Sequence, residues 1–488
     1  MALNLVRNSK VFFTTNVEAS TGKVAASGFT TSNTFEIQVL DGFSFSQGTN
    51  NETVTIMEGG SAPVRGQRSF NTSLNPVDFS FSTYLRPKNT GSAITAEESV
   101  LWNAMFSAAT PDTTGTAIGG TITGVTYAFN AGVGTVTIAG TSLTLSGIAQ
   151  GDIVVIGGIA TATGPGAAFF NSAATVASIS GTAITLNLIN PTSQASTITT
   201  PASIKLFKSA WAPVASTYSY ASSAASDKHQ LLKFGMIFLV DQVAYVVDNC
   251  AIGQVSIDFG LDAIATAAWT GQGTSLRQVS TNLTFTVSGS TGTFGGSGLT
   301  GSYAAKVTDA AYIANKLSTV ALTLVNSLKD SSGTTQGAAN DAYTIPITGG
   351  SITISNNITY LTPANLGVVN IPVAYYTGAR SITGTINAYL RTGGTRDSGE
   401  LLADMLAAAS ATTEPMASLS IAIGGSASTT RVELAMPATV LQIPTVDVQQ
   451  VVSTAINFTA EGYVPSSTAD ANAYDLTKTN DFAVRYYG

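Results

Sequence analysis

Apolar and polar residues alternate along much of this chain with the two-residue period of strands that bury one face. The segments 35–46 and 343–354 show the pattern most clearly, since each predicts a strand, a glycine turn and a second strand. The apolar positions predict a face that packs on a protein core. The intervening Ser and Thr positions predict an opposite face that meets water.

The same predicted elements occur twice in the chain. The strand pair at 35–46 matches the pair at 343–354, and a Tyr-Leu-Arg tripeptide that ends at Arg86 recurs where it ends at Arg391. Such self-similarity indicates a duplicated structural unit. Each copy combines a mainly antiparallel sheet with one helix, which is an α+β arrangement.

A short helix is predicted after each tripeptide. Thr95 is the expected N-cap of the first helix and Glu98 closes its capping box, while Asp397 and Glu400 take these roles in the second. Apolar stripes at helical spacing follow in both copies and indicate helices packed on a sheet. Their members are Val100, Leu101, Ala104 and Met105, then Leu401, Leu402, Met405 and Leu406.

Each copy ends in two long apolar strands. The segment 234–271 matches 431–462, with Trp269 falling on Phe458. Matched positions lie much further apart early in the copies than late, so the first copy holds roughly a hundred extra residues after its helix, the size of a small domain. This insert, at about 111–213, has short Val/Ile/Thr runs and regular glycine turns that predict a small all-β module.

These residues resemble the tail tube proteins of tailed bacteriophages. The resemblance lies in LDGFSFSQ, RSFNTSLNPVDFSFSTYLRP and TAEESVLWNAMF, and in SIDFGLDAIATAAWTGQG at the end of the first copy. It covers both copies, about four-fifths of the chain. It implies a mainly β (α+β) fold with two tandem tail-tube β-sandwich or barrel domains, each with one helix, plus a small all-β inserted domain.

The expected domain boundaries follow from the matched positions. The first tube domain is expected at 1–110 and 214–285, the inserted domain at 111–213, a linker at 286–310 and the second tube domain at 311–488.

The resemblance also implies a function. A structural virion protein, made in the host cytoplasm, would polymerise into stacked rings and form the tail tube through which the genome reaches the host. The commonest tube proteins carry one tube domain and form hexameric rings, so two domains per chain predict trimeric, pseudo-hexameric rings. Expected partners are a tape-measure protein inside the tube and sheath, tail-tip or terminator proteins. Double-stranded DNA is expected to pass through without specific binding.

Rings that form a tube must also stack, and two long loops are expected to make the contacts between rings. The loop 47–76 is too long for a simple hairpin turn. Its counterpart, 356–380, carries a single charge. The expected stacking residues are Glu52, Glu58, Arg65, Arg68 and Arg380.

Composition narrows the alternatives. Charged residues make up 10% of the 488 residues, against about 25% in an average soluble domain. Such low charge fits a membrane protein or a β-rich protein that buries its surface against its own copies. The best apolar run, 234–247, contains Asp241 and is shorter than the roughly 20 residues of a spanning helix, so no membrane insertion is expected. A net charge of −7 makes the chain a poor phosphate binder.

No catalytic, cofactor or metal site is predicted, and the chain is not expected to be an enzyme. His229 is the single histidine and has no nucleophile signal beside it. Cys250, in an apolar strand-like segment, is expected to be a buried thiol. The GxGxxG glycines Gly296, Gly298 and Gly301 follow a Ser/Gly run, so they predict a flexible linker and not a dinucleotide site.

Two other classes of protein stay open. One is another virion part, such as a tail terminator, baseplate or decoration protein, which would form single closed rings or bind a lattice. The other is a bacterial surface adhesin, for which a signal peptide and disulfides would be expected. An enzyme that cleaves surface glycans would need a carboxylate pair in a cleft, and no local cluster in the sequence marks one.

Overall fold

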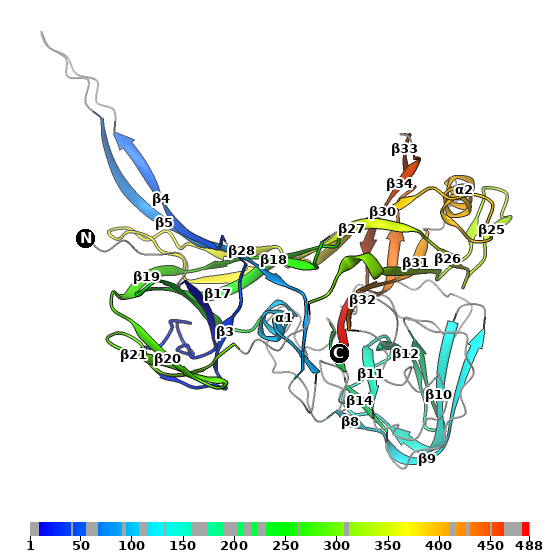
Figure 1. The fold of residues 1–488 in the computed structure, drawn as a ribbon, viewed down its shortest axis with the longest axis horizontal. Coiled ribbons are helices and arrows are strands. Elements are labelled where there is room, and N and C mark those ends of the chain that lie inside the picture. The colour runs from blue at the N-terminus through cyan, green and yellow to red at the C-terminus, as the bar shows by residue number, and fades with distance from the viewer. Residues whose placement is uncertain are drawn as a thin grey trace, which may run out of the picture.

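The computed structural model shows an elongated, mainly β protein with two α-helices in its described part (Figure 1). Statements below concern the residues that the structure describes. These are 9–40, 42–54, 67–89, 94–106, 115–130, 133–157, 173–188, 204–207, 217–221, 231–261, 263–306, 312–409, 415–424, 430–448, 451–462 and 481–487. The predicted mainly β fold class is confirmed.

The first unit is the part of the structure from β1 to α1 and from β16 to β22. Its early elements are β1 (Lys10–Thr14), β2 (Ser27–Phe29), β3 (Thr34–Ile37), β4 (Ser44–Val54), β5 (Arg68–Tyr84), β6 (Pro87–Asn89), β7 (Ile94–Ala96) and α1 (Ser99–Phe106). Its later elements are β16 (Phe234–Val240), β17 (Val243–Asp258), β18 (Thr266–Gly273), β19 (Ser275–Ser280), β20 (Thr284–Ser288), β21 (Thr291–Gly295) and β22 (Thr300–Ala304).

The second unit runs from the 3-10 turn Asn315–Leu317 to the C-terminal strand. Its elements are β23 (Thr319–Leu324), β24 (Leu328–Lys329), β25 (Thr335–Gly337), β26 (Ala342–Thr344), β27 (Ile347–Ser355), β28 (Ile358–Leu361), β29 (Ala374–Thr377), β30 (Ser381–Tyr389), α2 (Ser398–Ala408), β31 (Met416–Ile423), β32 (Arg431–Leu441), β33 (Thr445–Asp447), β34 (Ser453–Ala460) and β35 (Ala483–Tyr487).

The two units share one strand topology. In the first, β1 lies between β3 and β16, and β5 pairs with both β4 and β18. In the second, β23 lies between β26 and β31, and β30 pairs with both β27 and β34. The duplication predicted from the sequence is therefore a duplication of the fold.

One predicted match between the copies is displaced. Trp269 pairs with Phe81 and Ile456 pairs with Ile386, and both partners stand three residues before the tyrosine of a Tyr-Leu-Arg tripeptide. Trp269 therefore corresponds to Ile456 and not to Phe458. A shift of two residues keeps a side chain on the same face of a strand, which is why the apolar pattern alone did not reveal it.

The helix caps differ between the copies. Asp397 caps α2 as predicted, since its side chain accepts hydrogen bonds from the N–H groups of Gly399 and Glu400. The predicted cap Thr95 is wrong, because residue 95 lies in β7 and α1 begins only at Ser99. The backbone carbonyl of Glu98 instead accepts the first helical hydrogen bonds, from the N–H groups of residues 101 and 102.

Both helices bury part of the predicted stripe against a sheet. Trp102 of α1 contacts Trp269 edge to face, with ring centroids 5.0 Å apart. In α2, Leu401 and Met405 are buried, whereas Leu406 is exposed. The second stripe is therefore narrower than the sequence predicts.

The segment expected to be a flexible linker is folded. Strands β20, β21 and β22 form an antiparallel ladder, and β22 adds to β2. Phe294 and Tyr303 from this segment are buried against Phe12. Gly296, Gly298 and Gly301 all have positive φ, so these glycines make turns that other residues adopt with strain. The glycine-rich pattern therefore reflects the positive φ angles of tight turns and not a flexible linker.

The insert forms a separate seven-stranded sheet in the order β8-β14-β11-β12-β13-β10-β9. These strands are β8 (Thr116–Ala117), β9 (Gly119–Asn130), β10 (Val133–Thr144), β11 (Ile153–Gly157), β12 (Ala173–Ile179), β13 (Ala183–Leu188) and β14 (Lys205–Phe207). They enclose a core of their own that includes Val136, Ile138 and Leu186. Figure 1 shows the insert hanging from the body on the side away from the projecting hairpin of β4 and β5.

Candidate functional site: the polar face of the joined sheet

One continuous sheet crosses both units. Its strands follow the order β4-β5-β18-β17-β27-β30-β34, and β34 also pairs with β32 and β33. The joint between the units is an antiparallel pairing of β17 with β27, from Gln254 opposite Ser355 to Asp258 opposite Ser351. The edge of the first unit is thus completed by the second unit of the same chain (Figure 1).

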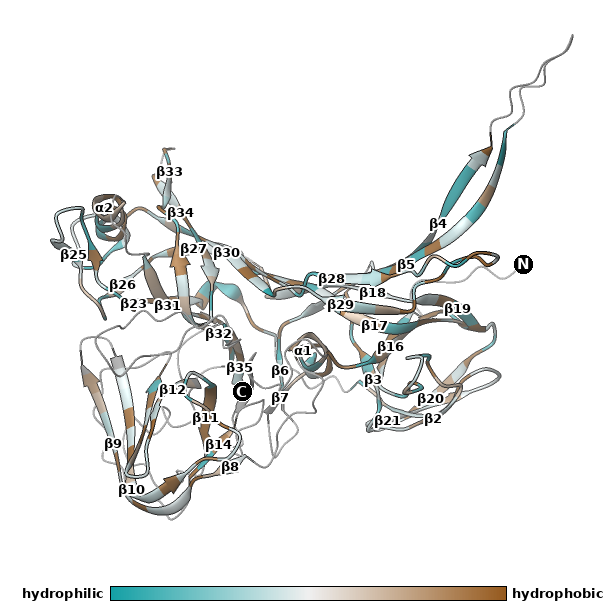
Figure 2. Cartoon of the chain, turned by 180° about the vertical axis from the view of Figure 1, so that it is seen from behind, coloured by the Kyte–Doolittle hydropathy of each residue, from teal (hydrophilic) through white to brown (hydrophobic). Residues whose placement is uncertain are grey.

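The two faces of this wall sheet differ sharply. Inward positions pack in the main core and include Phe79, Phe81, Val255, Ile257, Trp269, Ile352, Ile354, Ile382, Ile386, Ile456 and Phe458. Residues between them are polar and partly or fully exposed, including Ser44, Ser46, Asp78, Ser80, Gln254, Ser256, Gln272, Thr353, Thr383, Thr385 and Asn457. The alternation is visible as changing hydropathy along β5 and β30 (Figure 2). The predicted Ser/Thr-rich face is therefore present, and it runs across both units.

Neighbouring side chains tie this polar face together. The Ser44 and Ser80 hydroxyls lie 2.8 Å apart, and the Gln272 side chain donates to Asp78 Oδ1 over 2.8 Å. In the second unit the Thr385 hydroxyl donates to Asn457 Oδ1 over 2.7 Å. Because the side chains satisfy one another along the wall, they leave a smooth polar surface.

The charge on the wall has one sign. Its strand segments, 44–48, 77–84, 254–258, 266–273, 347–355, 381–389, 445–447 and 453–460, contain no lysine or arginine. They do contain three carboxylates, Asp78, Asp258 and Asp447. Such a face repels nearby phosphates over roughly the 8–10 Å reach of unscreened charge.

Side chains of the second unit fasten the joint to the first. The buried Asn356 amide donates to Met105 O over 2.9 Å and to Ile252 O over 3.1 Å. Met105 lies in the last turn of α1, whose carbonyls have no partner inside the helix. Asn356 therefore caps the helix of the other unit.

A tyrosine strengthens the same joint. The Tyr360 hydroxyl lies 2.9 Å from Asn249 O and 2.8 Å from Gln272 O, and its single O–H is shared between these two carbonyls. Burial raises the pKa of Tyr360 well above its ordinary value, so the hydroxyl keeps the proton that it donates.

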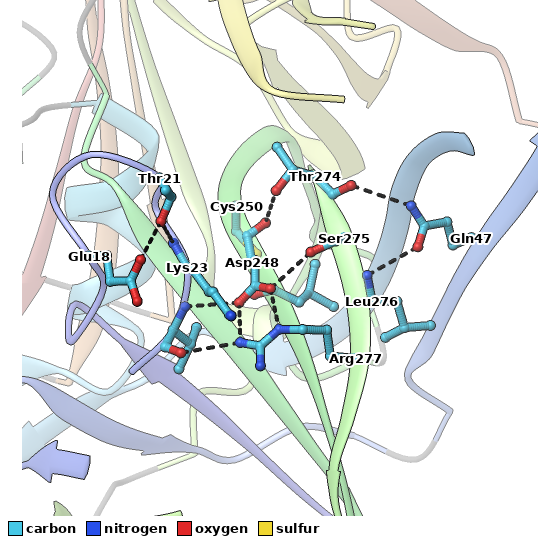
Figure 3. Close-up of polar contacts among 12 residues, drawn as sticks. Glu18, Thr21, Lys23, Gln47, Asp248, Cys250, Thr274, Ser275, Leu276 and Arg277 are labelled. Carbon is cyan, nitrogen blue, oxygen red and sulfur yellow. Dashed lines mark hydrogen bonds and ion pairs between the residues drawn. The ribbon is translucent and has the colours of Figure 1, made fainter. Parts of the chain in front are cut away.

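The root of the β4–β5 hairpin is anchored by a polar network that the sequence gave no reason to expect (Figure 3). Arg277 grips the buried Asp248 carboxylate with two hydrogen bonds, of 2.5 and 2.7 Å, and this contact raises the pKa of Arg277. Gln47 of β4 donates to Thr274 O and accepts from the N–H of Leu276, both next to this pair. The hairpin, called the arm below, therefore leaves the body from a fixed base.

The predicted stacking residues do not gather in one place. Glu52 and Arg68 are exposed on the arm, where Glu52 lies opposite Phe70 and Arg68 opposite Val54. Glu58 and Arg65 lie outside the described residues. The exposed arm projects away from the rest of the molecule in both views (Figures 1 and 2).

Arg380 is engaged within the chain. Its Nη2 lies 2.9 Å from Asp481 Oδ1, and its guanidinium stands 5.3 Å from the ring centre of Phe106. This partner lies a hundred residues away, so spacing along the sequence could not have suggested it. The Arg380–Asp481 ion pair therefore helps to hold the C-terminal segment against the rest of the molecule.

The described residues offer little for chemistry. No group of three or more His, Cys, Asp or Glu side chains among them is placed to hold a metal ion. Cys250 is buried as predicted, and burial raises the pKa of its thiol. His229 lies outside the described residues. None of the helices in this part of the chain has the length and apolar character needed to cross a membrane.

Comparison with known proteins gives one informative match. No protein-family model matches the chain. The chain is 26% identical over 515 aligned positions to the tail tube protein pb6 of Escherichia phage T5, in an alignment that covers 99% of this chain and 79% of that protein. The match spans both units and the insert, and the mainly β fold agrees with it. The chain is therefore similar, over nearly its whole length, to a bacteriophage protein named as a tail tube protein.

Proposed function

We propose that three copies of the chain close into a ring of six similar units, that such rings stack into the tail tube, and that the polar face of the wall sheet lines the bore. The observation that carries this proposal is the β17–β27 pairing, which joins two similar units edge to edge within one chain. Repeating that contact between chains closes the sheet and removes its exposed edges. In this proposal the protein acts as a structural subunit of the tube and carries out no enzymatic step.

The internal joint also predicts the contact between chains. Strand pairing inside each unit equates Ser46 with Thr353 and Thr445 with Ser256. Since Thr353 faces Ser256 at the internal joint, Thr445 should face Ser46 of the next chain. In the described part of the chain β33 pairs with β34 along one side, and its three residues are exposed, so its other side can accept this strand.

Cysteine cross-linking tests the ring. In a Cys250→Ala background, Ser46→Cys with Thr445→Cys should form disulfides between chains under mild oxidation, because opposed residues in antiparallel strands lie about 4.5–5.5 Å apart. Non-reducing gels should show dimers and trimers and no larger species. The matched control, Ser44→Cys with Thr445→Cys, is two residues out of register and should cross-link poorly.

Each contrary result has a separate meaning. Tubes without the in-register cross-link would show that rings close through another edge. A ladder of products beyond three chains would show that the ring count is wrong. Closed rings that never elongate would favour a tail terminator.

The lining predicts how the bore treats DNA. Asp78, Asp258 and Asp447 supply negative charge without a basic residue on the same strand segments, so duplex DNA should pass without being held. Assembled tubes should not bind fluorescent duplex DNA at physiological salt, whereas Asp258→Lys should introduce weak binding that falls as salt rises. A tape-measure protein in the bore and terminator, tail-tip or sheath proteins at the outside complete the proposed set of partners.

The arm is the proposed link to the neighbouring ring. Glu52 and Arg68 stand on its exposed strands, and the stacking role expected of Glu58 and Arg65 belongs to the same loop. Arg380 already pairs with Asp481, so the charged contacts between rings are assigned to the first-unit loop. Deleting 49–73 should give folded rings that do not elongate in negative-stain electron microscopy.

A further inference from the structure

The loop between β28 and β29 carries an exposed apolar surface with no charge. The segment 356–379 contains no Asp, Glu, Lys or Arg. Six of its aliphatic side chains are between about half and fully exposed. They form what is called the apolar platform below: Leu361, Leu366, Val368, Val369, Ile371 and Val373. Exposed apolar surface gathered in this way marks an interaction site more often than a bare protein face.

The platform is held in place rather than left loose. Strands β28 and β29 pair in register, and Tyr360 fixes their base to the first unit. Asn370, between Val369 and Ile371, accepts from Leu74 N–H over 2.8 Å and donates its own N–H to Thr72 O. Its apolar neighbours are therefore presented by a backbone tied to the foot of the arm.

Chemistry narrows the partner. A surface without charge or basic groups has nothing to offer a phosphate backbone, so DNA is a poor occupant. The platform also lies off β33 and β4, the two edges assigned to ring closure. Its partner must therefore be apolar and must come from another direction.

The arm of the same chain has matching character. Val54 and Phe70 are exposed large apolar residues, and they share one face of the hairpin with Glu52 and Arg68 because the pairs Glu52–Phe70 and Val54–Arg68 are two residues apart. A contact between two different patches of one chain is heterologous, and when rotation does not close it the contact propagates as a filament.

We infer that the apolar platform is the surface on which the arm of a second copy, in the adjacent ring, docks. This inference rests on the proposed stacking of rings. It assigns the stacking contact of the second unit to the aliphatic side chains around Val369 and not to Arg380.

Charge placed on the platform tests the inference. Leu366→Asp with Val369→Asp should leave ring formation intact by light scattering after size exclusion, and should raise the protein concentration needed for tube growth at least tenfold. Ser331→Asp with Ser332→Asp, in the exposed turn between β24 and β25, adds the same two charges elsewhere and should elongate normally. Thermal unfolding of all variants should match the wild type, since the substituted side chains are exposed.

A rescue experiment identifies the partner. Phe70→Lys alone should stall elongation, and Phe70→Lys combined with Val369→Asp should restore it, because the arm of one ring then meets an opposite charge on the platform of the next. Normal tubes from the platform variant would overturn the inference, as would a failed rescue. Loss of rings as well as tubes in the platform variant would also overturn the inference, because the platform would then be a contact between chains of one ring. The cross-linking test above decides separately whether the wild-type chain forms rings.

Discussion

Replacing Asn356 by alanine should loosen the joint between the two units. The side chain is buried and donates to the carbonyls of Met105 and Ile252. Alanine removes both donors and leaves two buried acceptors without them. An unsatisfied buried acceptor costs about 1–3 kcal/mol, so the loss of donors to two acceptors in Asn356→Ala should lower the free energy of unfolding of this region by about 2–6 kcal/mol.

Tryptophan fluorescence during urea unfolding is a suitable assay for this change. Trp102 lies in the helix that Asn356 caps, and Trp269 packs against it, so both report on the joint. The transition that they follow should move to lower urea without a change in slope. The same variant should form fewer closed rings, because the angle between the units sets the curvature of the sheet.

A matched control separates the joint from the wall. Asn457→Ala also removes a side-chain hydrogen bond, from Thr385 over 2.7 Å, but at a partly exposed position where water replaces the partner. It should cost about 1 kcal/mol or less. Equal effects of Asn356→Ala and Asn457→Ala would refute the argument that the buried carbonyls make the difference.

Three further predictions address single positions. Burial raises the pKa of Glu98 from 4.5 to about 7, so between these pH values the folded protein binds a proton that the unfolded chain has lost. The free energy of unfolding should therefore fall by about 3 kcal/mol as pH rises from 4.5 through 7. A plot of urea midpoint against pH should lack this decrease in Glu98→Gln. Trp269→Ala should cost about 3–5 kcal/mol by calorimetry, since it opens a cavity in the core. Gly298→Ala should destabilise the protein by more than about 1 kcal/mol, since φ is +103° and a Cβ would stand 2.2 Å from Val279 O. Gly289→Ala, also at positive φ but with open space around it, is the control for backbone strain alone. An unchanged melting temperature of Gly298→Ala would favour the flexible-linker interpretation.

Local patterns predicted much of the wall. The period of two along 343–354 places Ile352 and Ile354 inward and Thr353 outward, and the structure agrees. The Asp397 cap was also readable, because an N-cap depends on residues three positions apart. Burial on one face and local hydrogen bonds are properties that a short stretch of sequence carries by itself.

Contacts between distant segments were not predictable in this way. Asp248 and Arg277 form the anchor of the arm from adjoining strands, and an ion pair leaves no periodic trace in a sequence. The C-terminal strand β35 pairs with both β32 and β15 (Thr217–Ala221), and Tyr486 reaches back to accept a hydrogen bond from Trp102 and to donate one to Glu98. Glu98 was assigned to a capping box because its spacing fits one, yet burial beside Tyr486 decided its role.

Duplication explains why the arm and the platform can differ. In a ring of identical single units the loops at equivalent places are all the same, so neighbouring units cannot carry different loops. Two units in one chain remove that constraint, because the first-unit loop 49–73 and the second-unit loop 356–380 occupy equivalent places in the topology but change independently. The first extends as a charged hairpin with Val54 and Phe70 exposed, and the second folds back on its neighbour and presents aliphatic side chains. If docking between rings uses this difference, replacing 361–373 by a short polar turn should stop growth at single rings, because Asn356 and Tyr360 stay in place at the joint while the aliphatic side chains are lost.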